Sequence, residues 1–112
     1  ARIILSQCVI YLASSEKSNS SYLAINKAQK LVEDTGNLKV PLSLRNSPTK
    51  MMKDMGYGKD YKYSHDFNNN FIAQEFLPDE IVETKLYEPA KNMKENKLRE
   101  YLKLRWKDKY KY

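Results

Sequence analysis

The residues with the clearest chemical potential lie between positions 55 and 67, in the stretch MGYGKDYKYSHDF. A phosphate-binding loop spaces its glycines as G-x-x-x-x-G-K-[ST], so that backbone N–H groups converge on the anion and a hydroxyl holds Mg²⁺. Here one residue separates Gly56 from Gly58, and Asp60 stands where the hydroxyl should be. The spacing therefore argues against nucleotide binding. We assign both glycines to backbone geometry, with a positive φ expected at Gly56 after a short helix.

The only histidine, His65, is followed by Asp66, and a carboxylate can orient an imidazole that acts as a base. No nucleophile or glycine-rich pocket accompanies this pair, and adjacent side chains usually point in different directions. We favour a turn fixed by hydrogen bonds of the two side chains over an enzyme site.

The single cysteine, Cys8, lies in an apolar stripe and is expected to be a buried thiol. One cysteine and one histidine cannot supply the ligands of a structural zinc site. We expect no catalytic, cofactor-binding or metal site in this chain.

The net charge of +6 is unevenly distributed along the 112 residues. Residues 1–56 carry +4, residues 57–90 carry −4 and residues 91–112 carry +6. The basic C-terminal segment either binds a polyanion or neutralises the acidic middle within the fold or across subunits. The length suits one domain with one hydrophobic core. No apolar run approaches the roughly 20 residues of a membrane span, and the first residues lack a signal-peptide pattern, so we expect a cytoplasmic protein with no membrane partner.

Periodicity predicts two helices that pack as an antiparallel hairpin. In residues 3–14 the apolar side chains fall at i, i+3, i+4 and i+7. A second helix is expected to start between Ser18 and Ser20 and to run to about Glu33, with Gly36 free to adopt a left-handed conformation beyond its end. The apolar face of the first helix consists of Leu5, Cys8, Val9 and Leu12.

The rest of the chain is predicted to be less regular until its last segment. Residues 38–44 form a packed connector, and a two-turn helix follows, with Ser47 as its cap and Pro48 in its first turn. Residues 57–90 lose helical period, and NNN at 68–70 indicates a turn between short extended segments. A charged helix is expected from Lys91 onwards. In the short helix, Met51, Met52 and Met55 are expected to face inwards. In the C-terminal helix, Glu95 is expected to form an ion pair with Arg99. The same helix carries an apolar stripe that consists of Leu98, Tyr101, Leu102 and Trp106.

Nine tyrosines among many lysines also raise the possibility of nucleic-acid binding, with bases stacked on rings and ammonium groups on phosphates. Acidic residues interrupt the densest clusters, so packing of the rings is the favoured interpretation. The DNA-contact candidates are Lys103, Arg105, Lys107, Lys109 and Lys111.

Three stretches carry a family resemblance: VIYLASSEKSNSSYLAI, VPLSLRNSPTKMMKDMGYGKDYKYSHDF and FLPDEIVETKLYEP. Together they resemble the C-terminal domain of the replication-associated recombination protein A family, the RarA or MgsA proteins, which are AAA+ ATPases related to the Werner-helicase-interacting protein. The likeness covers almost the whole chain. At Ser43 the family often has histidine, so no role is assigned to that position.

The resemblance implies a mainly helical, collar-like domain similar to that of clamp loaders, with an irregular or β-hairpin insertion around residues 57–90. It divides a single domain, 1–112, into a helical part (1–56), an aromatic and extended part (57–90) and a basic C-terminal helix (91–112). ATP and Mg would be bound by a motor domain that is absent here, because no Walker motif occurs; the chain is then a fragment of a longer ATPase.

The function implied is non-catalytic oligomerisation, as a homotetramer, of an ATPase that acts on DNA at stalled forks. Candidate partners are a further copy of the chain, DNA and replication proteins such as single-strand-binding protein, with a nucleoid-associated location through the parent protein. The alternative is a DNA-binding module that uses the basic C-terminal helix. The signature residues, expected to serve architecture or subunit contact, are Lys17, Ser18, Asn19, Tyr22, Arg45, Asn46, Lys50, Gly56, Tyr57, Gly58, Tyr61, Tyr63, His65 and Asp66.

Overall fold

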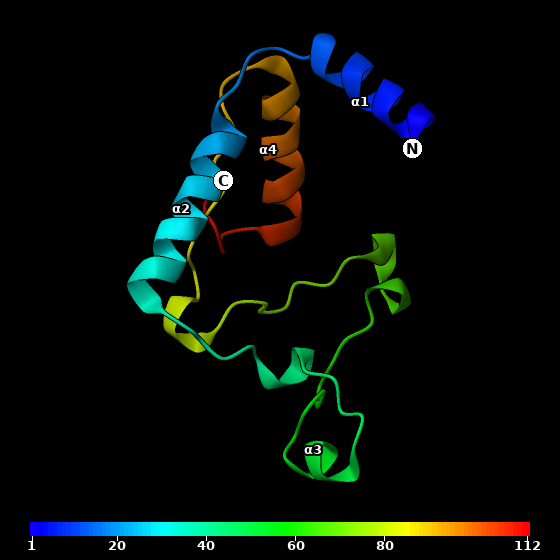
Figure 1. Ribbon diagram of the computed structural model, residues 1–112, viewed down its shortest axis with the longest axis vertical. Coiled ribbons are helices and arrows are strands. Elements are labelled where there is room, and N and C mark those ends of the chain that lie inside the picture. Colours follow the sequence, from blue (N-terminus) through cyan, green and yellow to red (C-terminus); the bar gives the residue numbers. More distant parts are fainter.

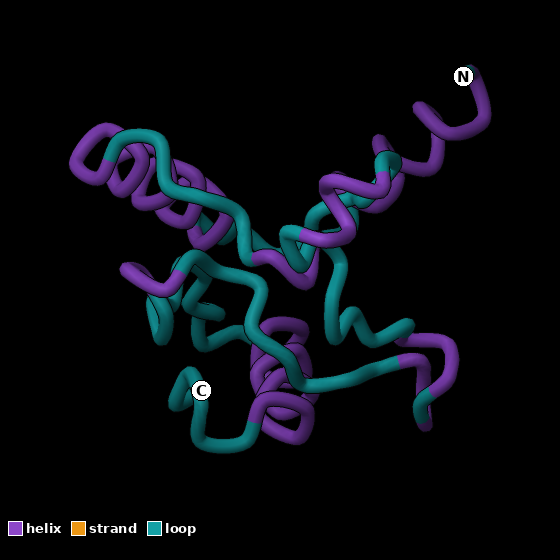
Figure 2. Tube along the Cα trace, turned by 90° about the horizontal axis from the view of Figure 1, so that it is seen from below, coloured by secondary structure: helices purple, strands orange, loops and turns teal.

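The computed structural model describes all 112 residues and contains helices and loops but no β-strand (Figures 1 and 2). The α-helices are α1 (Arg2–Ala13), α2 (Ser20–Thr35), α3 (Lys50–Asp54) and α4 (Met93–Trp106). Short 3₁₀ helices occur at Leu42–Leu44, Ser64–Asp66, Asn68–Asn70 and Asp79–Ile81. The predicted mainly α class is confirmed.

The β-hairpin considered for residues 57–90 is wrong. Asn69 and Asn70 have φ values of 59° and 52°, and the segment closes local 3₁₀ turns instead of a ladder. Pro78 and Pro89 also lack the N–H that a central strand would need. The backbone of this segment therefore makes local turns and a few bonds to distant groups, such as Gly58 N to Leu42 O and Lys27 Nζ to Lys85 O, in place of a strand ladder.

The predicted antiparallel hairpin of α1 and α2 does not form, since no Cα atom of α1 comes within 8 Å of α2. The linker between them runs over the start of α4, where Lys94 Nζ donates to Ser14 O at 3.3 Å and to Ser15 Oγ at 3.3 Å. Consequently α1 projects away from the other helices, as the ribbon and the Cα tube both show (Figures 1 and 2).

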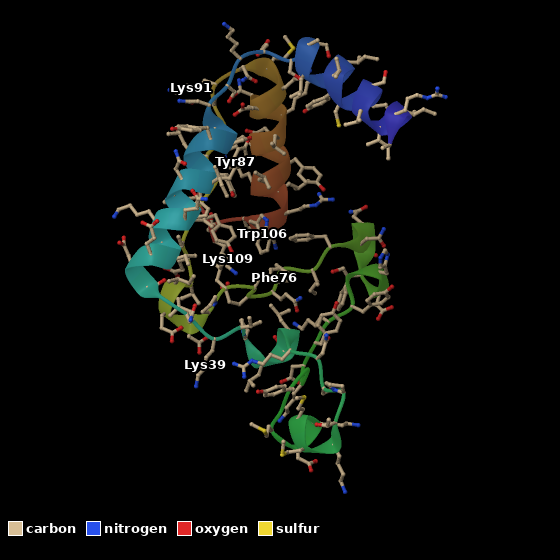
Figure 3. The ribbon with its side chains drawn as sticks, viewed as in Figure 1. Lys39, Phe76, Tyr87, Lys91, Trp106 and Lys109 are labelled. Atoms are coloured by element: carbon tan, nitrogen blue, oxygen red, sulfur yellow. The ribbon has the colours of Figure 1, made fainter.

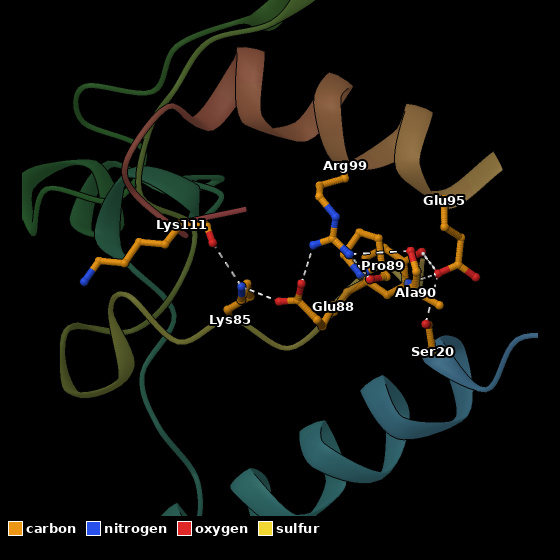
Figure 4. Close-up of polar contacts among 9 residues, drawn as sticks. Ser20, Lys85, Glu88, Pro89, Ala90, Glu95, Arg99 and Lys111 are labelled. Atoms are coloured by element: carbon orange, nitrogen blue, oxygen red, sulfur yellow. Dashed lines mark hydrogen bonds and ion pairs between the residues drawn. The ribbon is translucent and has the colours of Figure 1, made fainter. Parts of the chain in front are cut away.

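The best-packed region lies between α2 and α4, where the segment 85–90 runs between the two helices (Figures 1 and 4). Ser20 and Pro89 are the two buried residues of the chain, and both lie here. Lys27 Nζ donates to the carbonyl of Lys85, which fastens α2 to the same segment.

A second cluster consists of aromatic rings around the end of α4 (Figure 3). The Trp106 ring meets Phe71 and Tyr110 edge-on, each with ring centroids 5.1 Å apart, and lies 6.3 Å from Phe76. Such arrangements are the favoured geometry for aromatic pairs. They attach the middle of the chain to its C-terminal end.

Residues 37–63 form a separate lobe that contains α3, at the end of the molecule far from α1 (Figure 1). Thr49 caps α3, its Oγ1 accepting from Met52 N at 3.2 Å, so the predicted Ser47 cap is wrong. Because α3 has five residues, it is too short to present a broad inner face. Met51 and Met55 are exposed and Met52 is half-buried, contrary to the expected inward packing.

The chain is much more open than its length predicts. Its radius of gyration is 17.7 Å, against about 13 Å for a compact domain of this length. It exposes 9434 Å² of surface, against about 6,400 Å² for a compact protein of its mass. No hydrophobic side chain is buried, so the single hydrophobic core expected from the length is absent.

Candidate functional site

Helix α1 is the largest uncovered apolar element. Its large apolar side chains are 63% to 70% exposed, and Cys8 is exposed as well, contrary to the expected burial. Only its C-terminal end is held, by the Lys94 contacts and by Lys94 Nζ at 5.2 Å from the centre of the Tyr11 ring. A shallow hollow on one side is lined by Ile4, Gln7, Cys8, Tyr11 and Leu12.

Glu95 is the polar centre of the packed region (Figure 4). Its Oε2 accepts from Ser20 Oγ at 3.0 Å and from the Ala90 amide, and Tyr87 OH lies 3.5 Å from the same oxygen. Hydrogen bonds from the Ser18 hydroxyl, the Ala90 amide and the Ser20 hydroxyl lower the pKa of Glu95 to about 2. The carboxylate therefore joins the start of α2 and the segment 87–90 to the first turn of α4.

Arg99 binds the segment 85–90 from α4. Its guanidinium pairs with Glu88 and donates to the carbonyl of Pro89. Lys85 also pairs with Glu88 and donates to Lys111 O at 3.3 Å. Hydrogen bonds from Lys85 and Arg99 lower the pKa of Glu88. The predicted ion pair between Glu95 and Arg99 is wrong, because each side chain has nearer partners in this segment.

The N-terminal signature residues lie at the start of α2. Ser18 Oγ accepts from Ser20 N at 3.2 Å, and Asn19 is the N-cap residue but makes no capping hydrogen bond with its side chain. Lys17 and Tyr22 are exposed. This group is far from the lobe that holds the other signature residues (Figure 1).

Within that lobe the structure brings Arg45, Tyr57 and Gly58 together. The Arg45 guanidinium lies 5.0 Å from the centre of the Tyr57 ring, and its Nε donates to Val40 O at 2.6 Å. Gly58 N donates to Leu42 O at 2.7 Å. The lobe also contains the signature residues Asn46, Lys50, Tyr61 and Tyr63, whose side chains are exposed.

Gly56 and Gly58 have φ values of 87° and 73°, so the predicted positive φ is confirmed at Gly56. A Cβ on Gly58 would lie 3.2 Å from Arg45 O, whereas one on Gly56 would meet only Leu42 Cδ1 at 4.0 Å. Of these two glycines, only Gly58 has backbone of another residue close to the place that a Cβ would occupy.

His65 and Asp66 lie in an exposed 3₁₀ turn, where Asp66 N donates to Tyr63 O at 3.0 Å. The rings of His65 and Tyr63 have centroids 5.0 Å apart. No side-chain hydrogen bond joins His65 to Asp66, so the turn is held by backbone contacts. No group of three or more His, Cys, Asp or Glu side chains is placed to hold a metal ion.

The five basic DNA-contact candidates divide into two sets. Arg105 stacks on Tyr101, with Cζ 3.8 Å from the ring centre, and Lys109 Nζ pairs with Glu75 at 2.7 Å. Both are half-buried and engaged within the chain. The exposed set consists of Lys103, Lys107 and Lys111.

Sequence reasoning missed Glu95 as a junction between elements. The spacing Asn92-x-x-Glu95 is a capping signal, and Asn92 Oδ1 does accept from Glu95 N at 2.8 Å. It predicts the start of α4 but not the long-range contacts of the carboxylate. The aromatic cluster around Trp106 was also missed, since no local spacing links Phe71 to Trp106.

These features define an all-helical domain with large uncovered apolar and basic surfaces. Its sequence matches the family model described as "MgsA AAA+ ATPase C terminal" over residues 1–106. The chain belongs to this family, which confirms the resemblance seen in the sequence.

Among curated relatives, "Replication-associated recombination protein A" of Coxiella burnetii is 43% identical over 101 residues, which is 89% of this chain and 23% of the relative. The protein of the same name from Escherichia coli is 42% identical over 103 residues, 91% of this chain and 23% of the relative. "ATPase WRNIP1" of Dictyostelium discoideum is 43% identical over 83 residues, 73% of this chain and 10% of the relative.

The chain thus spans about a quarter or less of the length of these relatives. None of its helices combines the length and hydropathy that a bilayer crossing requires.

Proposed function

We propose that this chain is a non-catalytic oligomerisation domain of an AAA+ ATPase that acts in replication-associated recombination, and that it assembles as a homotetramer. The proposal rests mainly on one observation: the chain exposes 9434 Å² and buries no hydrophobic side chain. The excess over a compact protein of the same mass is about 3,000 Å². Surface of this extent and apolar character is typical of subunit contacts.

The relatives add the cellular context. Their names place them among replication-associated recombination proteins and ATPases. In this proposal the motor part of the parent protein binds ATP and Mg, and this chain holds the subunits together. DNA and replication proteins such as single-strand-binding protein are then reached through the parent protein.

Sedimentation equilibrium on the 112-residue chain tests the proposal. We expect a mass that increases with concentration through the micromolar range and approaches four copies. A chain that remains monomeric at high micromolar concentration contradicts assembly by these residues.

A DNA-binding role is the second candidate, because Lys103, Lys107 and Lys111 are exposed at and beyond the end of α4. The test is a salt titration with single-stranded DNA. Replacing the three lysines by Gln should reduce the slope of log K against log salt by about 2, since each contact contributes roughly 0.7.

Lys30→Gln is the matched control for that titration. Lys30 is exposed on α2 and already pairs with Asp34 at 3.2 Å. Equal slopes for the triple variant and for Lys30→Gln would remove the C-terminal lysines from consideration.

A further inference from the structure

Arg45 differs from the other half-buried basic side chains of the chain. Lys85, Arg99 and Lys109 pair with carboxylates, and Arg105 lies against two aromatic rings. Arg45 lies against one ring and makes no ion pair. Basic side chains that leave solvent are normally paired, so the charge of Arg45 is available to an anion from outside the chain.

The contacts of Arg45 fix its guanidinium and leave most of its donors free. Its Nε donates to Val40 O at 2.6 Å, and its Cζ lies 5.0 Å from the centre of the Tyr57 ring. A guanidinium carries five N–H donors in one plane, so the four on the two Nη atoms remain. A guanidinium that is already held in place binds phosphate through paired N–H groups at little entropic cost.

An open hollow of about 340 Å³ adjoins Arg45 in the lobe 37–63. Its volume lies at the lower end of the range for small-molecule pockets, about 300–1,000 Å³. Neither Asp nor Glu lines it. The lining side chains that carry N–H or O–H donors are Ser43, Arg45, Asn46, Ser47 and Tyr61.

Gly58 keeps this hollow open. It also lines the hollow, and a Cβ on it would lie 3.2 Å from Arg45 O and 3.7 Å from Ser47 Oγ. A larger residue would therefore occupy the space beside the Ser47 hydroxyl, which glycine leaves accessible to a ligand.

The charge of the lobe favours an anion. Residues 37–63 contain six basic and two acidic residues, a net charge of +4. The five lysines among them are exposed. A positive field of this kind raises the local concentration of anions.

We propose that this hollow binds a phosphate group, with Arg45 as the charged ligand and the side chains of Ser43, Asn46 and Ser47 as further donors. A phosphate offers three or four oxygens in tetrahedral directions, which suits one guanidinium together with several single donors. The site goes beyond both functions proposed above and depends on neither assembly nor the C-terminal lysines.

Proton–nitrogen correlation NMR on the whole chain at constant ionic strength tests the proposal. The probes are inorganic phosphate, thymidine 5′-monophosphate and thymidine. We expect the amide signals of residues 43–47 and of Gly58 to shift saturably with the first two probes, with a dissociation constant of about 1 mM or below. Thymidine, which lacks the phosphate group, should leave them unchanged.

Arg45→Gln should weaken phosphate binding by at least about tenfold, because it removes the charge and the paired donors. Arg105→Gln is the matched control, since Arg105 is also half-buried against aromatic rings but lies outside the hollow. Ser47→Ala keeps the charge of the site and should weaken binding by about fivefold.

The amide signal of Gly56 reports whether the lobe stays folded, because Gly56 N donates to Lys53 O at 3.0 Å and Gly56 does not line the hollow. If Arg45→Gln moves this signal to its position in the unfolded chain, Ser47→Ala decides the test.

Two oligothymidylates, one with a 5′-phosphate and one with a 5′-hydroxyl, distinguish the sources of the phosphate. Stronger binding of the phosphorylated strand, lost in Arg45→Gln, assigns the hollow to a terminal phosphate. Equal binding of the two strands, weakened in Arg45→Gln, assigns it to the phosphodiesters of the backbone.

Three results would overturn the proposal. The first is the absence of a saturable shift with inorganic phosphate. The second is an equal loss of binding in Arg45→Gln and Arg105→Gln, which would show attraction by net charge without a defined site. The third is an equally strong response to acetate, which would assign the hollow to a carboxylate, such as that of an acidic peptide segment.

Discussion

Replacing Glu95 by Gln should strongly destabilise the chain. The carboxylate receives the Ser20 hydroxyl and the Ala90 amide on one oxygen, with Tyr87 OH at 3.5 Å. Glutamine keeps the shape but loses the charge, and its NH₂ group cannot accept from these donors. With the amide oxygen in the place of Oε2 these donors keep only a neutral acceptor, and with the NH₂ group in that place the donors from α2 and from segment 87–90 lose their acceptor.

The magnitude follows from the hydrogen bonds. A hydrogen bond to a charged group contributes about 1.5–3 kcal/mol, and Gln retains a weaker neutral acceptor. Because the site is only half-buried, we expect a loss of about 2 kcal/mol in the free energy of unfolding. This is a large share of the stability of a chain with no buried hydrophobic side chain.

The same contact predicts a pH dependence. Folding lowers the pKa of Glu95 from 4.5 to about 2. The stabilisation is therefore fully present above pH 4.5 and is lost as the pH falls through about 2, where the folded carboxylate also becomes protonated. The Glu95→Gln variant should lack this component.

Urea unfolding followed by Trp106 fluorescence, repeated between pH 2 and 7, measures both effects, because 4.5 and about 2 bracket the titration. Glu100→Gln is the control, since Glu100 is exposed on the same helix and makes no ion pair. If Glu95→Gln behaves like Glu100→Gln, or retains the acid dependence of the parent chain, the junction assigned to Glu95 is wrong.

Two further stability predictions concern backbone geometry and the Arg99 contacts. Gly58→Ala should lower the free energy of unfolding in urea by about 2 kcal/mol, because a positive φ is combined with the approach of an added Cβ to Arg45 O at 3.2 Å. Gly56→Ala has only the positive φ and should lower it by about 1 kcal/mol. Equal values for the two variants would refute the role of the close approach. Arg99→Lys should lower the free energy of unfolding by about 1 kcal/mol, since an ammonium lacks the planar pair of N–H groups with which the guanidinium binds Glu88 and the Pro89 carbonyl together. An unchanged urea midpoint for Arg99→Lys would show that charge alone matters at this position.

Helix positions were predictable from sequence because helical hydrogen bonds are local. The expected second helix, from Ser18–Ser20 to about Glu33, is Ser20–Thr35 in the structure, and the helix expected from Lys91 is Met93–Trp106. Gly36 has the expected positive φ, at 69°. These features depend on residues within a few positions of one another.

Packing was not predictable, because it depends on which distant segment makes the more favourable contacts with each helix face. The stripe on α1 indicated a covered surface, yet no part of this chain covers it. Glu95 and Arg99 have the spacing of an ion pair on α4, but Glu88 and the backbone at 89–90 compete for both. Local spacing identifies candidate partners and cannot rank them against non-local ones.

The charge pattern had two interpretations: the structure confirms part of the internal neutralisation, and polyanion binding stays a prediction. Glu75 pairs with Lys109 and Glu88 pairs with Arg99, so part of the acidic middle neutralises part of the basic C-terminal segment within one chain. Lys103, Lys107 and Lys111 stay exposed. Sequence could show the imbalance between segments, but only the fold shows which lysines are already engaged.

The apolar and basic surfaces lie on different elements, and this separation makes the two proposed roles experimentally distinguishable. Helix α1 carries the uncovered apolar side chains, while the exposed lysines lie at and beyond the end of α4. Val9→Glu should therefore alter assembly without removing any phosphate contact. If assembly brings several lysine sets onto one strand, effective concentration should strengthen DNA binding beyond that of a single copy. Val9→Glu would then weaken DNA binding at assembling concentrations and leave it unchanged at dilution, whereas replacement of the lysines would weaken it at both.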